Sequence, residues 1–317
     1  MTVEIIRKRM VAEDIAVFDL ADPAGGDLPA FSAGAHIDVE VRPGMVRQYS
    51  LCSPPCGRQR YTIAVLKEPV SRGGSVAMHA LTEGALLNVS KPRNHFELDG
   101  DARRSLLFAG GIGITPILCM AQRLQHTGAD FELHYCGRTL SRMAFHRELA
   151  SSAFAGRTHL HLDDGPPGQR LDLDAVLNNQ AEAGAHIYVC GPKGFIDFVL
   201  AAAAAQGFAS DTLHREFFTV DPAPEAEAGS TFQIQIASTG QLLTVTPDRS
   251  ALEVMRDHGV PVPASCELGV CGTCITRILA GVPDHRDFIL NAKERAAGDQ
   301  FTPCCSRAKS PLLVLDL

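Results

Sequence analysis

The chain of 317 residues is long enough for two or three domains, since one domain takes about 100 to 200 residues. Lys and Arg number 29 against 36 Asp and Glu, with no basic run, which argues against a nucleic-acid partner. The N-terminal sequence lacks the apolar core of a signal peptide, and the longest apolar stretch, 195–205, is shorter than the roughly 20 residues that cross a membrane. Although ten cysteines are present, we expect a cytoplasmic protein with reduced thiols and no membrane partner.

Residues 1–100 carry short, often alternating apolar runs such as HIDVEV, YTIAVL and ALLNVS, separated by Pro and Gly. This pattern predicts an antiparallel β-barrel. Within it, RQYSL places an arginine, a tyrosine and a serine where a flavin would need them: Arg47 for a phosphate, Tyr49 for the face of the ring and Ser50 for its edge. Alone the match is weak, because Arg and Tyr on alternate strand positions often form an ordinary surface pair.

The stretch SRGGSVAMHAL at 71–81 predicts a helix that opens on glycines. Bare backbone N–H groups at such a start receive a phosphate. We therefore assign the phosphate of the same cofactor to Arg72, Gly73, Gly74 and Ser75.

From residue 101 to 221, strand-like runs such as SLLFAGG and HIYVCGP alternate with helical stretches, which predicts an α/β domain around a parallel sheet. FAGGIGITPI follows the first strand and opens a helix, the context in which glycines let backbone approach a pyrophosphate. It departs from G-x-G-x-x-G, because Thr115 and Pro116 follow Gly111 and Gly113.

A second signature, YVCGPKGF, ends another strand and makes Cys190, Gly191 and Pro192 nucleotide-site candidates; the alternative for the cysteine is a buried strand-end thiol. Arg138 and Arg142 either bind a 2′-phosphate and select NADPH or are simply solvated. Acidic residues outnumber basic ones between 101 and 229, and this excess favours NADH.

Pro, Ala, Glu and Gly dominate VDPAPEAEAGS, which predicts an interdomain linker at 222–230. In the last segment, 231–317, FQIQIAS and QLLTVTP predict a hairpin around Gly240, followed by a helix and the strands ITRILAG and PLLVLDL. This order predicts an α+β domain.

Three cysteines in CELGVCGTC, Cys266, Cys271 and Cys274, have the C-x4-C-x2-C spacing of plant-type [2Fe-2S] proteins. A fourth thiolate must follow, and the spacing selects Cys304 over the adjacent Cys305. The alternatives are a structural zinc or incidental buried thiols. Gly269 and Gly272 favour the cluster, because backbone wraps closely around sulfides where side chains are absent.

Together CELGVCGTC, DHRDFIL and PCCSRAKS resemble the C-terminal ferredoxin domain of the phthalate dioxygenase reductase family, which includes the vanillate demethylase reductases. In the family the last ligand is followed by a variable residue and then Ser-Arg-Ala, which places Cys305 in the variable position. RQYSL, SRGGSVAMHAL and PRNHF resemble the family's FMN-binding barrel, and GGxGxTP with CGP its nicotinamide site. The resemblance implies a β-grasp ferredoxin domain, Thr115 near the flavin and Cys190 near the nicotinamide.

The implied function is a reductase that passes electrons from NADH through FMN and a [2Fe-2S] cluster to a terminal oxygenase, by resemblance a Rieske non-haem iron oxygenase or O-demethylase acting on an aromatic acid or related substrate. The alternatives are a reductase for another monooxygenase, or a redox-sensing module. FMN rather than FAD rests on the resemblance, although Phe217 and Phe218 offer rings for an adenine. His285 is expected at the surface, facing the partner or without a role.

Overall fold

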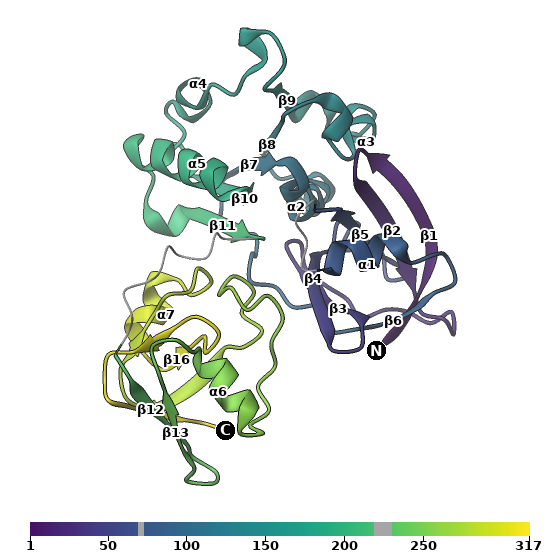
Figure 1. Cartoon of the computed structure of the whole chain (residues 1–317). Coiled ribbons are helices and arrows are strands. Elements are labelled where there is room, and N and C mark those ends of the chain that lie inside the picture. The colour runs from purple at the N-terminus through teal and green to yellow at the C-terminus, as the bar shows by residue number, and fades with distance from the viewer. Residues whose placement is uncertain (69–72, 219–229) are drawn as a thin grey trace. The chain divides into compact units, whose positions relative to one another are not determined.

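The computed structural model describes residues 1–68, 73–218 and 230–317 (Figure 1). The chain divides into two compact units, Met1–Phe218 and Thr219–Leu317. The predicted linker at 222–230 lies outside the described residues except for Ser230, and so does Arg72. No helix among the described residues is long and apolar enough to cross a membrane.

The first unit begins with an antiparallel sheet of six strands in the order β4-β3-β6-β1-β2-β5. Its elements are β1 (Thr2–Ala12), β2 (Ile15–Ala21), β3 (His36–Arg42), β4 (Met45–Ser50), β5 (Tyr61–Leu66), helix α1 (Gly74–Ala80) and β6 (Leu86–Val89). A single bridge joins Leu51, just after β4, to Ile63 of the other edge strand. The predicted strands and the glycine-led helix are confirmed, and Phe18, Ile37 and Tyr61 fill the core without exposure to solvent.

The second sheet of this unit is parallel, with the order β11-β10-β7-β8-β9. Its elements are β7 (Arg104–Gly110), α2 (Ile114–Thr127), β8 (Phe131–Gly137), α3 (His146–Ala150), β9 (Thr158–Leu162), α4 (Leu173–Leu177), β10 (Ala185–Gly191), α5 (Lys193–Ala205) and β11 (Leu213–Phe217). Every residue of β7 after Arg104 is buried, as expected for a strand covered on both faces. The predicted parallel α/β architecture is therefore present.

Besides the core of the antiparallel sheet, the first unit has a second apolar cluster in which its two sheets meet. Val17 and Ala64 of the antiparallel sheet belong to the same buried cluster as Ile117 and Cys119 of α2. The Cys119 thiol also donates a hydrogen bond to the Ser53 carbonyl oxygen at 3.2 Å. This packing holds the start of α2 beside the residues that follow β4.

The second unit contains a five-stranded mixed sheet in the order β13-β12-β18-β14-β16 and a two-stranded β15-β17 pair. Its elements are β12 (Phe232–Ile236), β13 (Leu242–Val245), α6 (Ala251–Asp257), β14 (Thr276–Ala280), β15 (Pro283–Asp284), α7 (Ala292–Ala297), β16 (Gln300–Phe301), β17 (Arg307–Ala308) and β18 (Leu312–Leu315). The predicted β12–β13 hairpin is present, with Gly240 in its turn at φ +72°. Ser250 and Glu253 form a capping box that starts α6.

Candidate functional site

Strand β4 and the start of α1 meet at the predicted flavin-phosphate residues. The Arg47 side chain packs so closely on Gly74 that a Cβ added at Gly74 would lie 2.5 Å from its Nε and 2.7 Å from its Cγ. Gly73 precedes the helix at φ +89°, a backbone conformation that favours glycine. The structure thus brings a guanidinium and the first N–H groups of a helix together, the donor set that a phosphate monoester requires.

At the end of β4, the Ser50 hydroxyl meets a residue that the sequence did not single out. Ser50 is buried, and its Oγ donates a hydrogen bond to Oε2 of Glu216 in β11 at 3.3 Å. Burial raises the pKa of Glu216 to about 8, although the Ser50 hydrogen bond acts in the opposite direction. Near neutral pH the Glu216 carboxyl group is therefore mostly protonated and adds little charge to the site.

Glu216 also stands opposite Cys190 in the parallel register of β10 and β11. Cys190 is completely buried, and burial, followed by the nearby Glu216 carboxylate, holds the pKa of its thiol well above the ordinary value. A buried thiol that stays protonated contributes to packing but does not act as a nucleophile. Ser50, Glu216 and Cys190 consequently form one group drawn from both sheets of the unit.

The two glycine signatures contact each other through backbone. A Cβ on Gly113 would lie 2.3 Å from the Cys190 carbonyl oxygen and 2.7 Å from the Gly191 nitrogen. A Cβ on Gly191 would likewise lie 3.0 Å from the Gly110 Cα. These glycines therefore let the start of α2 lie directly against the end of β10, where a dinucleotide is bound in related α/β sheets.

Thr115 and Pro116 lie in the first turn of α2, and both are buried. The Thr115 hydroxyl donates to the Ile112 carbonyl oxygen at 3.1 Å, while Pro116 has no N–H to leave unpaired there. Pro192 is the residue before α5, which begins at Lys193. All of these nucleotide-site candidates thus occupy the carboxyl ends of neighbouring strands β7 and β10.

Arg142, one of the two candidates for a 2′-phosphate, is engaged elsewhere. Its Nε lies 3.7 Å from a Glu13 carboxylate oxygen and its terminal nitrogen 3.6 Å from Asp14. These ion pairs join it to the turn between β1 and β2. The arrangement agrees with the preference for NADH that the acidic composition indicates.

In the second unit, the four predicted cluster cysteines form two pairs. The Cys274 and Cys304 sulfur atoms are 3.3 Å apart, and the Cys266 thiol hydrogen-bonds to Cys271. That hydrogen bond lowers the pKa of the Cys271 thiol. Among the described residues no group of three or more His, Cys, Asp or Glu side chains is arranged around a single metal ion. Two thiol pairs fit two irons that each take two thiolates, so the residues fit a [2Fe-2S] cluster.

Cys305 hydrogen-bonds to the adjacent Cys304 but otherwise has neighbours outside the predicted ligand set. Its sulfur lies 3.3 Å from the Thr302 hydroxyl, and a Cβ on Gly269 would come within 2.4 Å of it. Gly269 has φ +74°, so both its backbone conformation and the space around it require glycine. Cys304 rather than Cys305 therefore makes the contact with Cys274 that the predicted ligand set requires.

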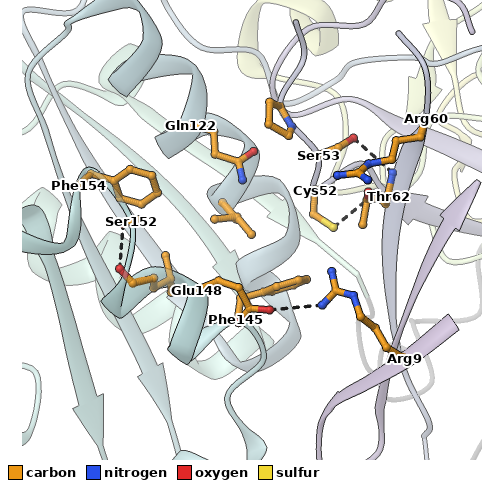
Figure 2. A pocket seen from close by; sticks show the side chains of 13 residues that line it. Arg9, Cys52, Ser53, Arg60, Thr62, Gln122, Phe145, Glu148, Ser152 and Phe154 are labelled. Carbon is orange, nitrogen blue, oxygen red and sulfur yellow. Dashed lines mark hydrogen bonds and ion pairs between the residues drawn. The ribbon is translucent and has the colours of Figure 1, made fainter. Parts of the chain in front are cut away.

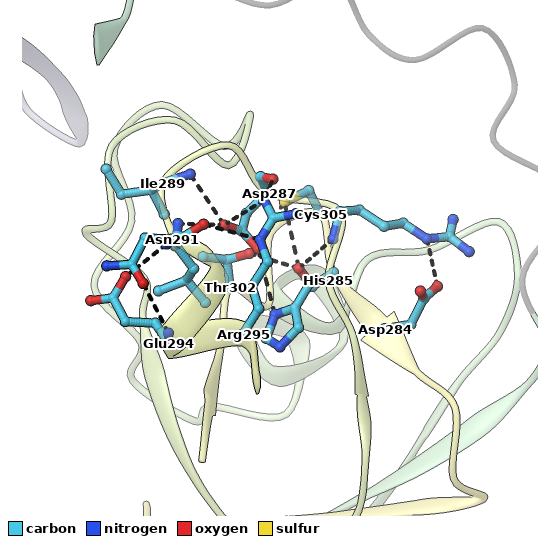
Figure 3. A network of polar contacts seen from close by, with 12 residues as sticks. Asp284, His285, Asp287, Ile289, Asn291, Glu294, Arg295, Thr302 and Cys305 are labelled. Carbon is cyan, nitrogen blue, oxygen red and sulfur yellow. Dashed lines mark hydrogen bonds and ion pairs between the residues drawn. The ribbon is translucent and has the colours of Figure 1, made fainter. Parts of the chain in front are cut away.

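The segment before α7 is fixed by a buried carboxylate (Figure 3). The Asp287 side chain is fully buried, and its Oδ1 accepts hydrogen bonds from the backbone N–H groups of Ile289 and Leu290. His285 lies 3.6 Å from the other Asp287 oxygen, and only 11% of its side chain is exposed. The expectation that His285 lies at the surface is wrong, because the histidine packs inward beside Asp287.

Two parts of the chain match models of known domain families. Residues 107–201 match the oxidoreductase NAD-binding domain, and residues 234–309 match the 2Fe-2S iron-sulfur cluster binding domain, which includes all four predicted cluster cysteines.

Relatives match the chain over almost its whole length. The vanillate O-demethylase oxidoreductase of Pseudomonas sp. (strain HR199 / DSM 7063) is 52% identical over 310 residues, 98% of this chain and 97% of the relative. The reductase subunit of the tert-butanol monooxygenase / tert-amyl alcohol desaturase of Aquincola tertiaricarbonis is 44% identical and aligns with 96% of this chain and 92% of its own. The solved structure of phthalate dioxygenase reductase superposes with a TM-score of 0.74 at 40% identity, covering 100% of this chain and 98% of that one.

The fold, the site and these matches define an NADH-dependent oxidoreductase with a nucleotide-binding unit and a [2Fe-2S] ferredoxin domain in one chain. The chain belongs to the phthalate dioxygenase reductase family, in which the vanillate O-demethylase oxidoreductases are also found. Its cofactors are FMN, NADH and the [2Fe-2S] cluster, and it is the reductase component of an oxygenase system.

Proposed function

We propose that the chain supplies electrons to a Rieske-type oxygenase that removes a methyl group from a methoxylated aromatic acid, of the kind that vanillate represents. The 52% identity with a vanillate O-demethylase oxidoreductase, over 98% of the chain, carries this proposal. The reductase of a tert-butanol monooxygenase, at 44% identity, supports a second candidate, an alcohol-oxidising partner. We also propose a cytoplasmic location, where the ten cysteines stay reduced.

We further propose that residues 1–100 form a flavin-binding barrel, 101–221 an NAD-binding domain and 231–317 a β-grasp ferredoxin domain, with a linker at 222–230. The Leu51–Ile63 bridge supports closure of the six-stranded sheet, because it joins residues at its two edges. The mixed sheet with α6 packed against its apolar core supports the β-grasp assignment.

The FMN phosphate is assigned to Arg47, Gly73, Gly74 and Ser75, with Arg72 as a further candidate. FMN is required because a nicotinamide gives up two electrons together, whereas an iron-sulfur cluster takes one at a time. Tyr49 offers its ring to the flavin face, and burial raises the pKa of its hydroxyl, which keeps it neutral. Ser50 is held by Glu216 and presents its hydroxyl at the flavin edge.

On the nicotinamide side, the proposed contacts come from the signatures that meet at the end of β10. The residues are Gly111, Gly113, Thr115, Pro116, Cys190, Gly191 and Pro192. The neutral Cys190 thiol adds no charge at the end of β10, and the group of Ser50, Glu216 and Cys190 excludes water from the place where the two rings must meet. The protein thus contributes placement rather than acid-base chemistry.

Cys266, Cys271, Cys274 and Cys304 are the proposed cluster ligands. The Leu268 backbone N–H donates to the Cys266 sulfur at 3.3 Å, a contact of the type that tunes iron-sulfur sites. The left-handed backbone at Gly269 lets the loop bring such N–H groups inward.

The partner is tested by reconstitution with purified oxygenase components. With the oxygenase of a vanillate O-demethylase, the chain should support vanillate-dependent NADH consumption and release of formaldehyde in equal amounts. The oxygenase of a tert-butanol monooxygenase serves as the matched comparison. Efficient turnover with the alcohol oxygenase alone would replace the aromatic proposal by the second candidate.

A further inference from the structure

A cavity of about 190 Å³ lies between the antiparallel sheet and helices α2 and α3 (Figure 2). Arg9 of β1 and Arg60, just before β5, reach it from the antiparallel sheet. Gln122 of α2 and Phe154 lie on the opposite side. None of the proposed flavin, nicotinamide or cluster residues lines this cavity.

The charge at the cavity is positive on balance. Arg9 pairs with Glu148 at 3.3 Å, and both side chains remain partly exposed, at 33% and 52%. Arg60 makes no ion pair with any residue that the structure describes. Two guanidinium groups facing one carboxylate leave one positive charge without an anionic partner, and guanidinium binds carboxylate strongly in a two-pronged geometry.

The opposite wall contains an unmet hydrogen-bonding group. The Gln122 side-chain carbonyl oxygen is buried and has no hydrogen-bond partner among the described residues. This oxygen has almost no accessible surface, so a ligand completes its hydrogen bonding only when the Gln122 side chain turns toward the cavity. A phenolic hydroxyl both donates and accepts, and therefore satisfies either orientation of this amide.

Between these polar ends the lining is mostly apolar, and its hydroxyl groups belong to Ser53, Thr62 and Ser152. Leu118, Phe145 and Phe154 surround the space. A cavity of about 150 Å³ lined by apolar side chains is large enough for benzene. The present cavity therefore has room for one substituted aromatic ring but not for a dinucleotide.

We propose that this cavity binds a single-ring phenolic carboxylate, with the carboxylate toward Arg60 and Arg9, the hydroxyl toward Gln122, and the ring against Leu118 and Phe145. The binding step forms no covalent bond. The site does not depend on which oxygenase receives the electrons, so failure of the proposed partner leaves it unaffected.

A ligand in this cavity would lie close to residues of the proposed nucleotide site. Leu118 lies one turn along α2 from Thr115, and Ser53, which also lines the cavity, follows Ser50 by three residues. Because the Cys119 thiol already joins these two segments through Ser53, a bound ring would contact both sides of the same junction.

Isothermal titration of the full-length holoprotein with 4-hydroxybenzoate tests the proposal, in the presence of saturating NAD⁺. We expect one saturable site, and binding at least about tenfold weaker for 4-methylphenol, which lacks the carboxylate, and for sulfate, which lacks the ring. Arg60→Gln should weaken 4-hydroxybenzoate binding about tenfold to a hundredfold. Arg58→Gln is the matched control, since Arg58 pairs with Asp27 and does not line the cavity, and it should bind as wild type.

Gln122→Leu provides a second, independent test. It should reduce the preference for 4-hydroxybenzoate over benzoate while leaving benzoate binding within about twofold. Thermal midpoints of all variants establish that they are folded. Three results would each overturn the proposal. They are loss of 4-hydroxybenzoate binding when NAD⁺ is added, wild-type affinity for 4-hydroxybenzoate in the Arg60→Gln variant, and no saturable binding at millimolar 4-hydroxybenzoate.

Discussion

Gly113→Ala is the substitution for which the structure gives the sharpest expectation. Gly113 has φ −60°, so its backbone suits any residue and only space requires glycine there. The added Cβ would lie 2.3 Å from the Cys190 carbonyl oxygen and 2.4 Å from its carbonyl carbon, both backbone atoms that have no rotamer to change. The start of α2 must therefore move away from β10. Overpacking of this kind typically costs about 1 to 3 kcal/mol of unfolding free energy.

Urea unfolding and steady-state NADH oxidation with ferricyanide measure the two consequences. The variant should lose about 1 to 3 kcal/mol of stability and show a raised KM for NADH, because Thr115 and Pro116 move with the helix. Gly194→Ala is the matched control: nothing lies within 4 Å of its added Cβ, and in α5 it should be neutral or stabilising by up to about 1 kcal/mol. A Gly113→Ala protein with wild-type stability and wild-type KM would refute the close contact between the two glycine signatures.

Three further outcomes are expected. Burial lowers the pKa of His36 and of His134 to about 3, so between pH 6.5 and 3 these histidines bind protons only in the unfolded chain. The free energy of unfolding is therefore full above pH 6.5 and falls by up to about 2 kcal/mol per histidine at pH 5. Urea unfolding at pH 7 and pH 5 should show that His134→Gln removes part of this loss. Ionisation of Glu216 above about pH 8 should tighten inhibition by the cationic NAD⁺ ring severalfold, and a Glu216→Gln variant that keeps this pH dependence would remove Glu216 from the site. Cys304→Ser should lose the visible absorption of the cluster while keeping flavin, whereas Cys305→Ser should keep both; the reverse result would make Cys305 the ligand.

Much of the secondary structure follows from local patterns. SLLFAGG and HIYVCGP form parallel strands as predicted, because strands buried on both faces are nearly continuous apolar runs. The helix at Ile114–Thr127 follows from its apolar spacing and ends before Gly128, whose φ of +71° terminates it. The candidate glycines were recognisable from sequence because a close approach between two backbone segments leaves room only for glycine.

Features that depend on distant pairing were not predictable from sequence. Glu216 became a site candidate only through its register opposite Cys190 and its hydrogen bond to Ser50, which lies 166 positions away in the chain. In HREFFTV only the two phenylalanines suggested a role, because a glutamate near the end of a strand has no distinctive local pattern. Helices α3 and α4, each of five residues, are too short for a periodic signal. The inward position of His285 likewise depends on Asp287, whose burial the sequence does not reveal.

The central claim is that electrons enter at the first unit and leave through the cysteines of the second. Residues Met1–Phe218 form a compact unit of their own, so a chain ending at Phe218 should fold, bind flavin and oxidise NADH with ferricyanide at close to the full-length rate. The most direct measurement compares this chain with the full-length protein in driving the purified oxygenase. The account predicts that the shortened chain gives no product above background. Product formation at the full-length rate would show that electrons leave from the flavin and that the cysteine pairs are not in the path.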